Sequence, residues 1–361
     1  MTTIGIVGAG AAAAAATHVL DGAVPDAEIT VLEKSGGLCG RAATRRNDDR
    51  SLVYDYGANY LKSANDRVVE LVTETLADDG MVDATEPIHT FDAAGEVSPG
   101  RDADDHKWSY RMGLTQIAKR LFGGTNANVY RRTRVETIRR EPNGDGDTDA
   151  SPGASDSVWT LVDTDGEQWG PFDVLLLNPP APQTAALLAD AEWDAPVRES
   201  LQQAAESVPY RSVWTAVLHY PFTLDRPYYG LVNTDKEHAV GWISREECKA
   251  GHVPDGESLL VVQAGGEWSV AHYDDDPADN VAELAGHTAE IVGDDRLLEP
   301  SWTDHQGWRY AIPEGGVDPD PVEAATAHDC YVLGDWVAGE ARLHAALANG
   351  LDVGDRVATR V

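Results

Sequence analysis

Short apolar runs and an alanine-rich segment alternate at the start of the chain. Ile4, Ile6 and Val7 form one apolar run and residues 28–32 form a second, and both predict buried strands. Between them, Ala11 to Ala16 follow a turn with two glycines and are strong helix formers. This order predicts strand, tight turn, helix and strand, although an alanine run also fits a plain low-complexity helix.

Two amphipathic segments and one apolar strand continue this part of the chain. The spacing of apolar residues predicts helices over 65–78 and 113–122. Residues 173–177 predict a buried strand that ends at Asn178, with a helix from Ala181 onward. Short strands are predicted between Arg131 and Trp169, interrupted at 141–157 by a polar stretch that we interpret as a mobile hairpin tip.

The pattern changes at Ser212, where long runs of aromatic and β-branched residues begin. They predict a second, mostly antiparallel sheet. Residues 277–292 have the periodicity of a helix across that sheet, and residues 330–333 predict a short buried strand that returns to the first domain. The predicted strands of the second sheet are SVWTAVLHY, HAVGWIS, SLLVVQA and WSVAHY.

The first turn has the GxGxxG/A pattern of a dinucleotide site. Gly8 permits a tight turn, Gly10 lets backbone approach a pyrophosphate, and Ala13 allows close packing of helix on strand. Glu33 ends the second strand about 20 residues further on, where a carboxylate accepts hydrogen bonds from a ribose diol and repels a 2′-phosphate. We assign Ala11 and Lys34, which lie beside these residues, to the same cofactor site.

A second glycine-rich turn follows Glu33 and carries guanidinium groups. Such groups suit bidentate contact with the other face of a pyrophosphate, which favours FAD over NAD as the cofactor. The residues of this turn are Gly36, Gly37, Gly40, Arg41, Thr44, Arg45 and Arg46.

These signatures resemble the start of the flavin amine oxidase superfamily. EKSGGLCGRAATRR followed by YDYGANY is similar to renalase-like FAD oxidoreductases, as are FDVLLLNPPAPQTAALL, GWISREECK, EWSVAH, GWRYAIP and GDWVAGEARLHAALANG. Two departures are Gly36, where that family usually has arginine, and Cys39, where it usually has glycine. The resemblance implies noncovalent FAD, with contacts from Tyr56, Gly57, Ala58, Val135, Gly334, Asp335 and Arg342.

The expected fold class is α/β. A Rossmann-type FAD/NAD(P)-binding domain of the p-hydroxybenzoate hydroxylase and amine oxidase kind would carry an inserted α+β substrate domain. We expect residues 1–80, 123–180 and 314–361 to form the discontinuous FAD domain, and residues 81–122 and 181–313 to form the substrate domain.

The composition of the chain excludes some classes of binding partner. The 361 residues include 28 basic and 61 acidic ones, and the net charge of −33 argues against nucleic acid or anionic membranes as partners. Lysine is scarce and aspartate abundant, which favours a surface adapted to high salt. Three separated cysteines give neither a disulfide framework nor metal spacing, so we expect no metal and a reducing cytoplasm, with no signal peptide. The oligomeric state stays open.

Several residues are candidates for the substrate site. Trp242, His272, Trp308, Arg309 and Tyr310 are expected to form an aromatic and cationic wall, or else to pack in the core. Arg309 is either an anion ligand or one half of a structural ion pair. His344 is either a catalytic acid or base or a structural residue, and the arginines at 131–140 either steer an anionic nucleotide or form a solvated face.

The resulting functional hypothesis is a renalase-like FAD oxidase. It would take hydride from a small reduced donor of the isomeric dihydronicotinamide dinucleotide type and pass it to oxygen, giving H2O2. The alternatives are a flavin amine oxidase, a non-enzymatic flavin redox sensor that uses Cys39, and an NAD dehydrogenase.

Overall fold

The structure is a computed structural model that describes residues 1–101, 105–142 and 157–361. The chain divides into two compact units, each made of separate stretches. Unit 1 comprises residues 1–40, 117–209 and 313–361, and unit 2 comprises residues 41–116 and 210–312. Most of the predicted hairpin tip at 141–157 lies outside the described residues.

Unit 1 is built on a parallel sheet of five strands, in the order β10-β2-β1-β14-β20. The apolar residues of the runs predicted as strands are buried here, as expected for a parallel sheet with covered faces. The strands are β1 (Thr3–Val7), β2 (Glu28–Glu33), β10 (Asn128–Arg131), β14 (Val174–Leu177) and β20 (Cys330–Val332).

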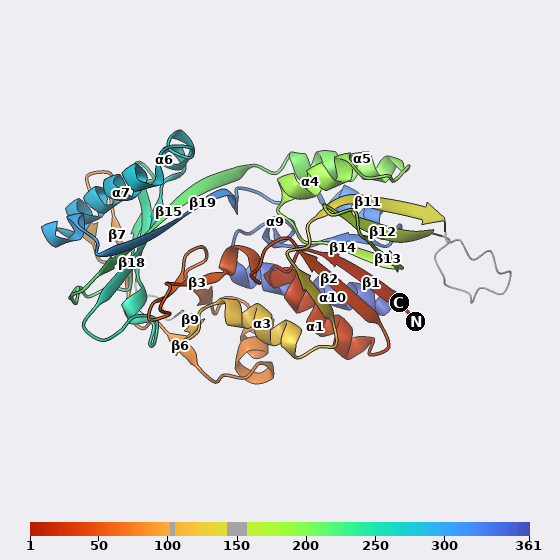
Figure 1. Ribbon diagram of the computed structural model, residues 1–361, viewed down its shortest axis with the longest axis horizontal. Helices are drawn as coiled ribbons and strands as arrows, with labels where there is room; N and C mark the ends of the chain where they lie inside the picture. The colour runs from red at the N-terminus through yellow and green to blue at the C-terminus, as the bar shows by residue number, and fades with distance from the viewer. Residues whose placement is uncertain (102–104, 143–156) are drawn as a thin grey trace. The chain divides into compact units, whose positions relative to one another are not determined.

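Helices α1 (Ala11–Ala23) and α10 (Leu343–Arg360) lie side by side in unit 1 (Figure 1). Every alanine from Ala11 to Ala16 is buried, so the run is a packing surface and not a low-complexity helix. Opposite it, a Cβ on Gly350 would lie 2.1 Å from the carbonyl oxygen of Ala12, so the two helices approach closely only because this position is glycine.

The remaining elements of unit 1 are a three-stranded antiparallel sheet and six helices among the described residues. The strands are β11 (Val135–Pro142), β12 (Ser157–Asp163) and β13 (Gln168–Phe172). The helices besides α1 (Ala11–Ala23) are α3 (Thr115–Gly123, its first two residues in unit 2), α4 (Ala181–Ala189), α5 (Pro196–Glu206), α8 (Pro319–Thr326), α9 (Asp335–Ala338) and α10 (Leu343–Arg360).

Unit 2 contains a mostly antiparallel sheet of seven strands, in the order β19-β15-β18-β17-β16-β7-β8. Only the pairing of β16 with β7 is parallel among the registers described. The strands are β7 (Ile88–Phe91), β8 (Val97–Ser98), β15 (Tyr210–Tyr220), β16 (Gly230–Asn233), β17 (Val240–Arg245), β18 (Ser258–Ala264) and β19 (Trp302–Pro313).

The two faces of this sheet carry different cores. Ala216, Leu218 and Leu260 pack with helix α7 (Pro277–Val292), whereas the intervening Val217 and Leu259 pack with tyrosines of the 52–56 segment. This is the alternation that a pleated strand imposes. The sheet therefore separates a helix-covered face from an aromatic face.

The other elements of unit 2 are short. They are β3 (Thr44–Arg46), β4 (Val53–Asp55), β5 (Leu61–Lys62), β6 (Met81–Asp83), β9 (Lys107–Tyr110), α2 (Asp66–Glu70), the π-helical turn η2 (Leu71–Thr75), α6 (Gly266–Ala271) and the 3-10 turns η1 (Gly40–Ala42), η3 (Glu246–Cys248) and η4 (Asp295–Leu298).

Three expectations need correction. The run WSVAHY is not a strand, because residues 266–271 form helix α6. The helix predicted over 65–78 is shorter, ending in the π-helical turn η2. The boundaries expected at residues 80 and 180 differ from those of the compact units, because residues 41–80 belong to unit 2 and residues 181–209 belong to unit 1. The predicted Rossmann-type domain and antiparallel sheet are confirmed.

Candidate functional site

The glycine turn of unit 1 leads from β1 into α1. Gly8 has a φ of +90°, and its N–H donates to the carbonyl of Leu32 at 2.8 Å. Gly10 is the extended N-cap of α1, and a Cβ there would lie 2.4 Å from Oδ1 of Asn178. Gly10 therefore has no room for a side chain, and the amino end of α1 begins directly at this glycine, where helix amides favour an anionic ligand.

Glu33 ends β2 beside this turn and is 8% exposed. Its Oε2 accepts from the N–H of Ala9 at 2.8 Å, and its Oε1 accepts from the N–H of Ser35 at 2.7 Å. The carboxylate thus fixes the turn on both sides. Each oxygen keeps a second lone pair, which can accept from a ligand hydroxyl.

Asn178 joins two parts of the predicted cofactor site, and sequence reasoning missed it. Its Nδ2 donates to the carbonyl of Leu333 at 3.0 Å, directly before Gly334, while its buried Oδ1 has no hydrogen-bond partner among the described residues. That Oδ1 faces Cα of Gly10. The available signal was its position directly after β14, since ligand residues gather at the carboxyl ends of parallel strands.

Gly334 adopts a conformation that favours glycine, with a φ of +138°. Its N–H donates to Oδ1 of Asn349 at 2.8 Å. The carboxylate of the buried Asp335 accepts from the N–H of Trp336 at 2.9 Å. The predicted GD pair is thus held rigidly at the start of α9.

Cys39 is buried and lies against the glycine turn, where its N–H donates to the carbonyl of Ala9 at 2.9 Å. Its φ is +79°, in the left-handed region that favours glycine. A glycine, which the similar family usually has at this position, adopts this backbone conformation without strain. The cysteine that replaces it in this chain is therefore strained.

The other predicted residues of unit 1 lie at its surface or in its core. Nζ of Lys34 donates to Oε1 of Gln183 at 2.8 Å, and partial burial lowers the pKa of this lysine. Val135 is buried in β11. Helix α10 begins with Arg342 as its exposed N-cap, and the buried His344 has Nε2 3.5 Å from Oε1 of Glu340.

Each residue of the segment Tyr56–Ala58 in unit 2 has a backbone group that is hydrogen-bonded to another part of the unit. Nε1 of Trp308 donates to the carbonyl of Tyr56 at 3.2 Å, and the two rings stack with centroids 5.1 Å apart. Nε2 of Gln263 donates to the carbonyl of Gly57 at 2.6 Å. The N–H of Ala58 donates to the carbonyl of Arg41 at 2.9 Å, and a Cβ on Gly57 would lie only 2.0 Å from that same oxygen.

The guanidinium groups expected at a pyrophosphate are engaged within unit 2. Arg41 donates to the carbonyl of Ala311 at 2.9 Å. Arg45 donates to Asp304 at 3.0 Å and covers the ring of Tyr56 at 4.3 Å. The remaining members of this turn are engaged too, because Arg46 donates to the carbonyl of Met112 and the hydroxyl of Thr44 donates to Asp55 at 2.6 Å.

The predicted aromatic and cationic wall is divided by the seven-stranded sheet. Trp308 packs with the aromatic core, and Tyr310 shares its face by alternation on β19. Arg309 points the other way, with its guanidinium over Tyr273 at 4.7 Å and 60% of its side chain exposed. His272 also lies on the helix-covered face, stacked on Trp268, so the five residues do not form one surface.

Trp242 stays on the aromatic face. It shares that side of β17 with Ser244, whose hydroxyl donates to Oδ1 of Asn59 at 3.0 Å, and its ring lies 6.4 Å from Tyr60 and 6.2 Å from Tyr229. Its buried Nε1 has no hydrogen-bond partner among the described residues. The indole therefore offers a donor that a ligand can satisfy.

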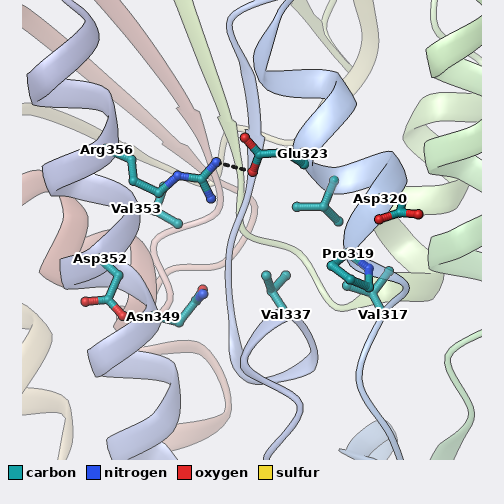
Figure 2. Close-up of a pocket in the computed structure, with 10 residues that line it drawn as sticks. Val317, Pro319, Asp320, Glu323, Val337, Asn349, Asp352, Val353 and Arg356 are labelled. Carbon is teal, nitrogen blue, oxygen red and sulfur yellow. Dashed lines mark hydrogen bonds and ion pairs between the residues drawn. The ribbon is translucent and has the colours of Figure 1, made fainter.

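A cavity of about 570 Å³ lies elsewhere in unit 1, between α8, α9 and α10 (Figure 2). Arg356 pairs with Glu323 at 2.5 Å across it. None of the predicted site residues lines it, but its wall residue Asn349 is the acceptor for the N–H of Gly334.

Comparison with known proteins supports the fold. Residues 6–75 match the model of an NAD(P)-binding Rossmann-like domain. Over 100% of this chain and 99% of the other, the structure is similar to a protein from Exiguobacterium sp. 255-15 named as a putative protoporphyrinogen oxidase, with a TM-score of 0.76 and 16% identity.

Two further structures share the fold but carry different activities in their names. Cyclohexylamine oxidase from Brevibacterium oxydans IH-35A has a TM-score of 0.72 and 12% identity, with 99% of each chain covered. Reduced UDP-galactopyranose mutase has a TM-score of 0.74 and 10% identity, with 100% of this chain and 94% of the other covered. Because one fold serves an oxidase and a mutase, the reaction must be argued from the site.

No helix in the described part of the chain is long and apolar enough to cross a bilayer.

Proposed function

We propose that the chain is an FAD-dependent oxidoreductase that binds its cofactor noncovalently. The observation that carries this proposal is the turn from Gly8 to Gly10, which leaves the amino end of α1 open beside the carboxylate of Glu33. A pyrophosphate fits against such backbone, and a ribose diol fits the free lone pairs of the carboxylate. The orphaned Oδ1 of Asn178 beside Gly10 can accept from a hydroxyl or N–H of the ligand, but not from the pyrophosphate, which has no donor.

Unit 1 holds the main candidate site, and unit 2 holds a separate candidate segment. In unit 1, the ribose would lie at Glu33, and the pyrophosphate would lie at Gly8, Gly10, Ala11 and Ala13. The ribityl chain and the flavin ring would lie toward Gly334, Asp335 and Arg342. The other residues proposed for this part of the cofactor site are Lys34, Gly40 and Val135. In unit 2, Tyr56, Gly57 and Ala58 would meet the cofactor. Arg41 and Thr44 are assigned to shape that segment, since Arg41 binds Ala58 through its carbonyl and Thr44 binds Asp55.

The proposed reaction is oxidation of a small reduced donor of the isomeric dihydronicotinamide dinucleotide type. Bound FAD would supply the hydride acceptor and the route by which electrons reach O2 to give H2O2. The chain would bind and orient the planar donor with Trp242, Trp308 and Tyr310, and the unpaired Nε1–H of Trp242 would donate to a carboxamide or carbonyl. Arg309 and His272 are left out of this surface because they lie across the sheet.

An amine oxidase is the second candidate, because a fold neighbour is named cyclohexylamine oxidase. A lysine that holds a water at the flavin would be expected for that chemistry. Lys249 does not fit this role, since its side chain is 0% exposed and its Nζ contacts Asp55 and Glu246. We therefore rank amine oxidation below dinucleotide oxidation.

A thiol-based redox sensor is less well supported. Burial raises the pKa of Cys248 and that of Cys330 to about 12, so neither thiol forms a reactive thiolate near neutral pH. Cys39 is 2% exposed beside the glycine turn. Cys39→Ser should therefore leave turnover and oxidant sensitivity unchanged.

The cofactor is tested by the visible spectrum of the purified protein. We expect a flavin band that acid precipitation releases completely into the supernatant, as noncovalent FAD. A colourless protein that takes up no added FAD would contradict the proposal and would favour the alternative that the chain is an NAD dehydrogenase.

The donor is tested by H2O2 release with isomeric dihydronicotinamides, NADH, NADPH, cyclohexylamine and putrescine. Release with the isomeric dinucleotides and not with the amines is the expected result. Turnover of the amines alone would reverse our ranking.

A further inference from the structure

Four charged side chains form a cluster in the interior of unit 2. Asp55, Glu246, Lys249 and His252 all have side-chain exposures of 0%. Nζ of Lys249 lies 3.0 Å from Oδ2 of Asp55 and 2.8 Å from Oε1 of Glu246, while Nδ1 of His252 lies 2.8 Å from Oε2 of Glu246. Removing any one of these four side chains would leave a buried charge without its partner, so the four depend on one another.

The hydrogen bonds of His252 balance the charges of this cluster. Its Nε2 faces the carbonyl of Tyr110 at 2.9 Å, which only accepts, so Nε2 carries a proton. Its Nδ1 faces the Glu246 carboxylate, so a second proton lies between these two groups. The cluster therefore holds two negative and two positive groups, or one of each with the Glu246–His252 pair neutral.

Asp55, Glu246 and His252 offer ligand atoms within 4.8 Å of one another, the one such group found in the described ranges. The ammonium of Lys249 takes the place of a cation among them. The site is thus already satisfied by the chain itself, and it carries no metal proposal.

The cluster is attached to the proposed cofactor segment through Asp55. Asp55 ends β4 and is followed directly by Tyr56–Ala58. Its Oδ1 accepts from Thr44 and from the N–H of Leu114, and its Oδ2 accepts from Ser109 at 2.8 Å as well as from Lys249. Its own N–H donates to Oε2 of Glu246 at 3.1 Å, so backbone and side chain are both held.

We propose that the buried cluster of Lys249, Glu246 and His252 positions the cofactor segment Tyr56–Ala58 through Asp55. This inference rests on the proposed FAD function. Asp55 fixes where β4 ends, and the following carbonyls of Tyr56 and Gly57 then meet Trp308 and Gln263. Lys249, Glu246 and His252 lie close together in the sequence and at least 191 positions from Asp55, and they are positioning residues for FAD that do not touch it.

The test is FAD binding by the full chain in matched variants of unit 2. Ser109→Ala removes one buried hydrogen bond to Asp55, and Tyr220→Phe removes one buried hydrogen bond, to the carbonyl of Leu297, on the other face of the sheet. Both should lose a similar, small part of the stability of the fold. We expect Ser109→Ala to raise the Kd for FAD about fivefold and to change the visible circular dichroism of the flavin, with Tyr220→Phe unchanged in both.

Lys249→Met is the stronger variant and should raise the Kd for FAD about thirtyfold or more if it folds. Equal changes in Kd for Ser109→Ala and Tyr220→Phe would overturn the inference, as would wild-type Kd and dichroism in Ser109→Ala. A wild-type chain that takes up no FAD would instead overturn the proposed function, and this inference with it.

Discussion

At the scale of single residues, the proposed cofactor turn depends on one missing side chain. Gly10 and Asn178 meet where a Cβ would lie 2.4 Å from Oδ1. The glycine was predictable from the GxGxxG/A spacing. The position of Asn178 after β14 could have made it a candidate, but its contact with Gly10 was not predictable, because the two residues lie 168 positions apart and only the parallel sheet brings them near.

Gly10→Ala is expected to lower the affinity for FAD at least about tenfold, because the new methyl must displace Asn178 and block approach of the pyrophosphate. Equilibrium titration with FAD measures this. Gly22→Ala is the control, since nothing lies within 4 Å of its Cβ in the same helix, and it should bind FAD normally. Equal affinity of both variants would contradict the assignment of the turn.

Asp55 makes unit 2 sensitive to acid. Burial alone would raise its pKa, but Lys249, His252 and the hydrogen bonds of Thr44 and Leu114 outweigh burial, so the pKa lies below its usual value. A carboxyl with a lowered folded-state pKa contributes stability that is present above its unfolded pKa of about 3.9 and is lost as pH falls through the folded value.

We therefore expect the difference in unfolding free energy between wild type and Asp55→Asn to be largest near neutral pH and to shrink below about pH 4. Urea unfolding from pH 7 to pH 3 measures this difference. A difference that stays constant across this range would show that the Asp55 carboxylate does not have the lowered pKa.

At the scale of elements, the spacing of apolar residues predicted the helices and strands whose apolar side chains are buried. Helix α7 was predicted at its observed limits, 277–292, because its apolar stripe packs on the sheet. Helix α6 was mistaken for a strand because six residues are too few to separate the two periods. The charged cluster was missed altogether, since Asp55 and Lys249 lie on elements 194 positions apart.

Close packing of α1 on α10 gives a prediction at this scale. Gly350→Ala should cost about 1–3 kcal/mol of unfolding free energy, because the backbone oxygen of Ala12 at 2.1 Å cannot move aside. Gly286→Ala in α7 meets nothing within 4 Å and should stabilise by about 0.5–1 kcal/mol. Chemical denaturation compares the two, and a neutral Gly350→Ala would contradict the close approach of the helices.

At the scale of the whole molecule, the feature that matters most for stability in different salt concentrations is the large negative net charge. A net charge of −33 repels itself in dilute buffer, and salt screens that repulsion over about 10 Å at 0.1 M and about 3 Å at 1 M. The sequence predicted this property directly, because it depends on composition and not on contacts.

We expect the Tm to rise steadily between about 0.1 and 2 M KCl, since screening lowers the repulsion of the folded state. Differential scanning fluorimetry measures the Tm, with sucrose of equal osmolality as the control for general exclusion effects. A Tm that falls or stays level in KCl would contradict an adaptation to high salt.

The proposed function requires that this fold hold FAD and oxidise a reduced dinucleotide. Anaerobic titration of the purified protein in high salt, followed at the visible flavin band, tests it most directly. We expect rapid bleaching by isomeric dihydronicotinamide dinucleotides and not by amines, with the band restored by air and H2O2 formed. A flavin that stays oxidised with these dinucleotides, or that only amines bleach, would contradict it.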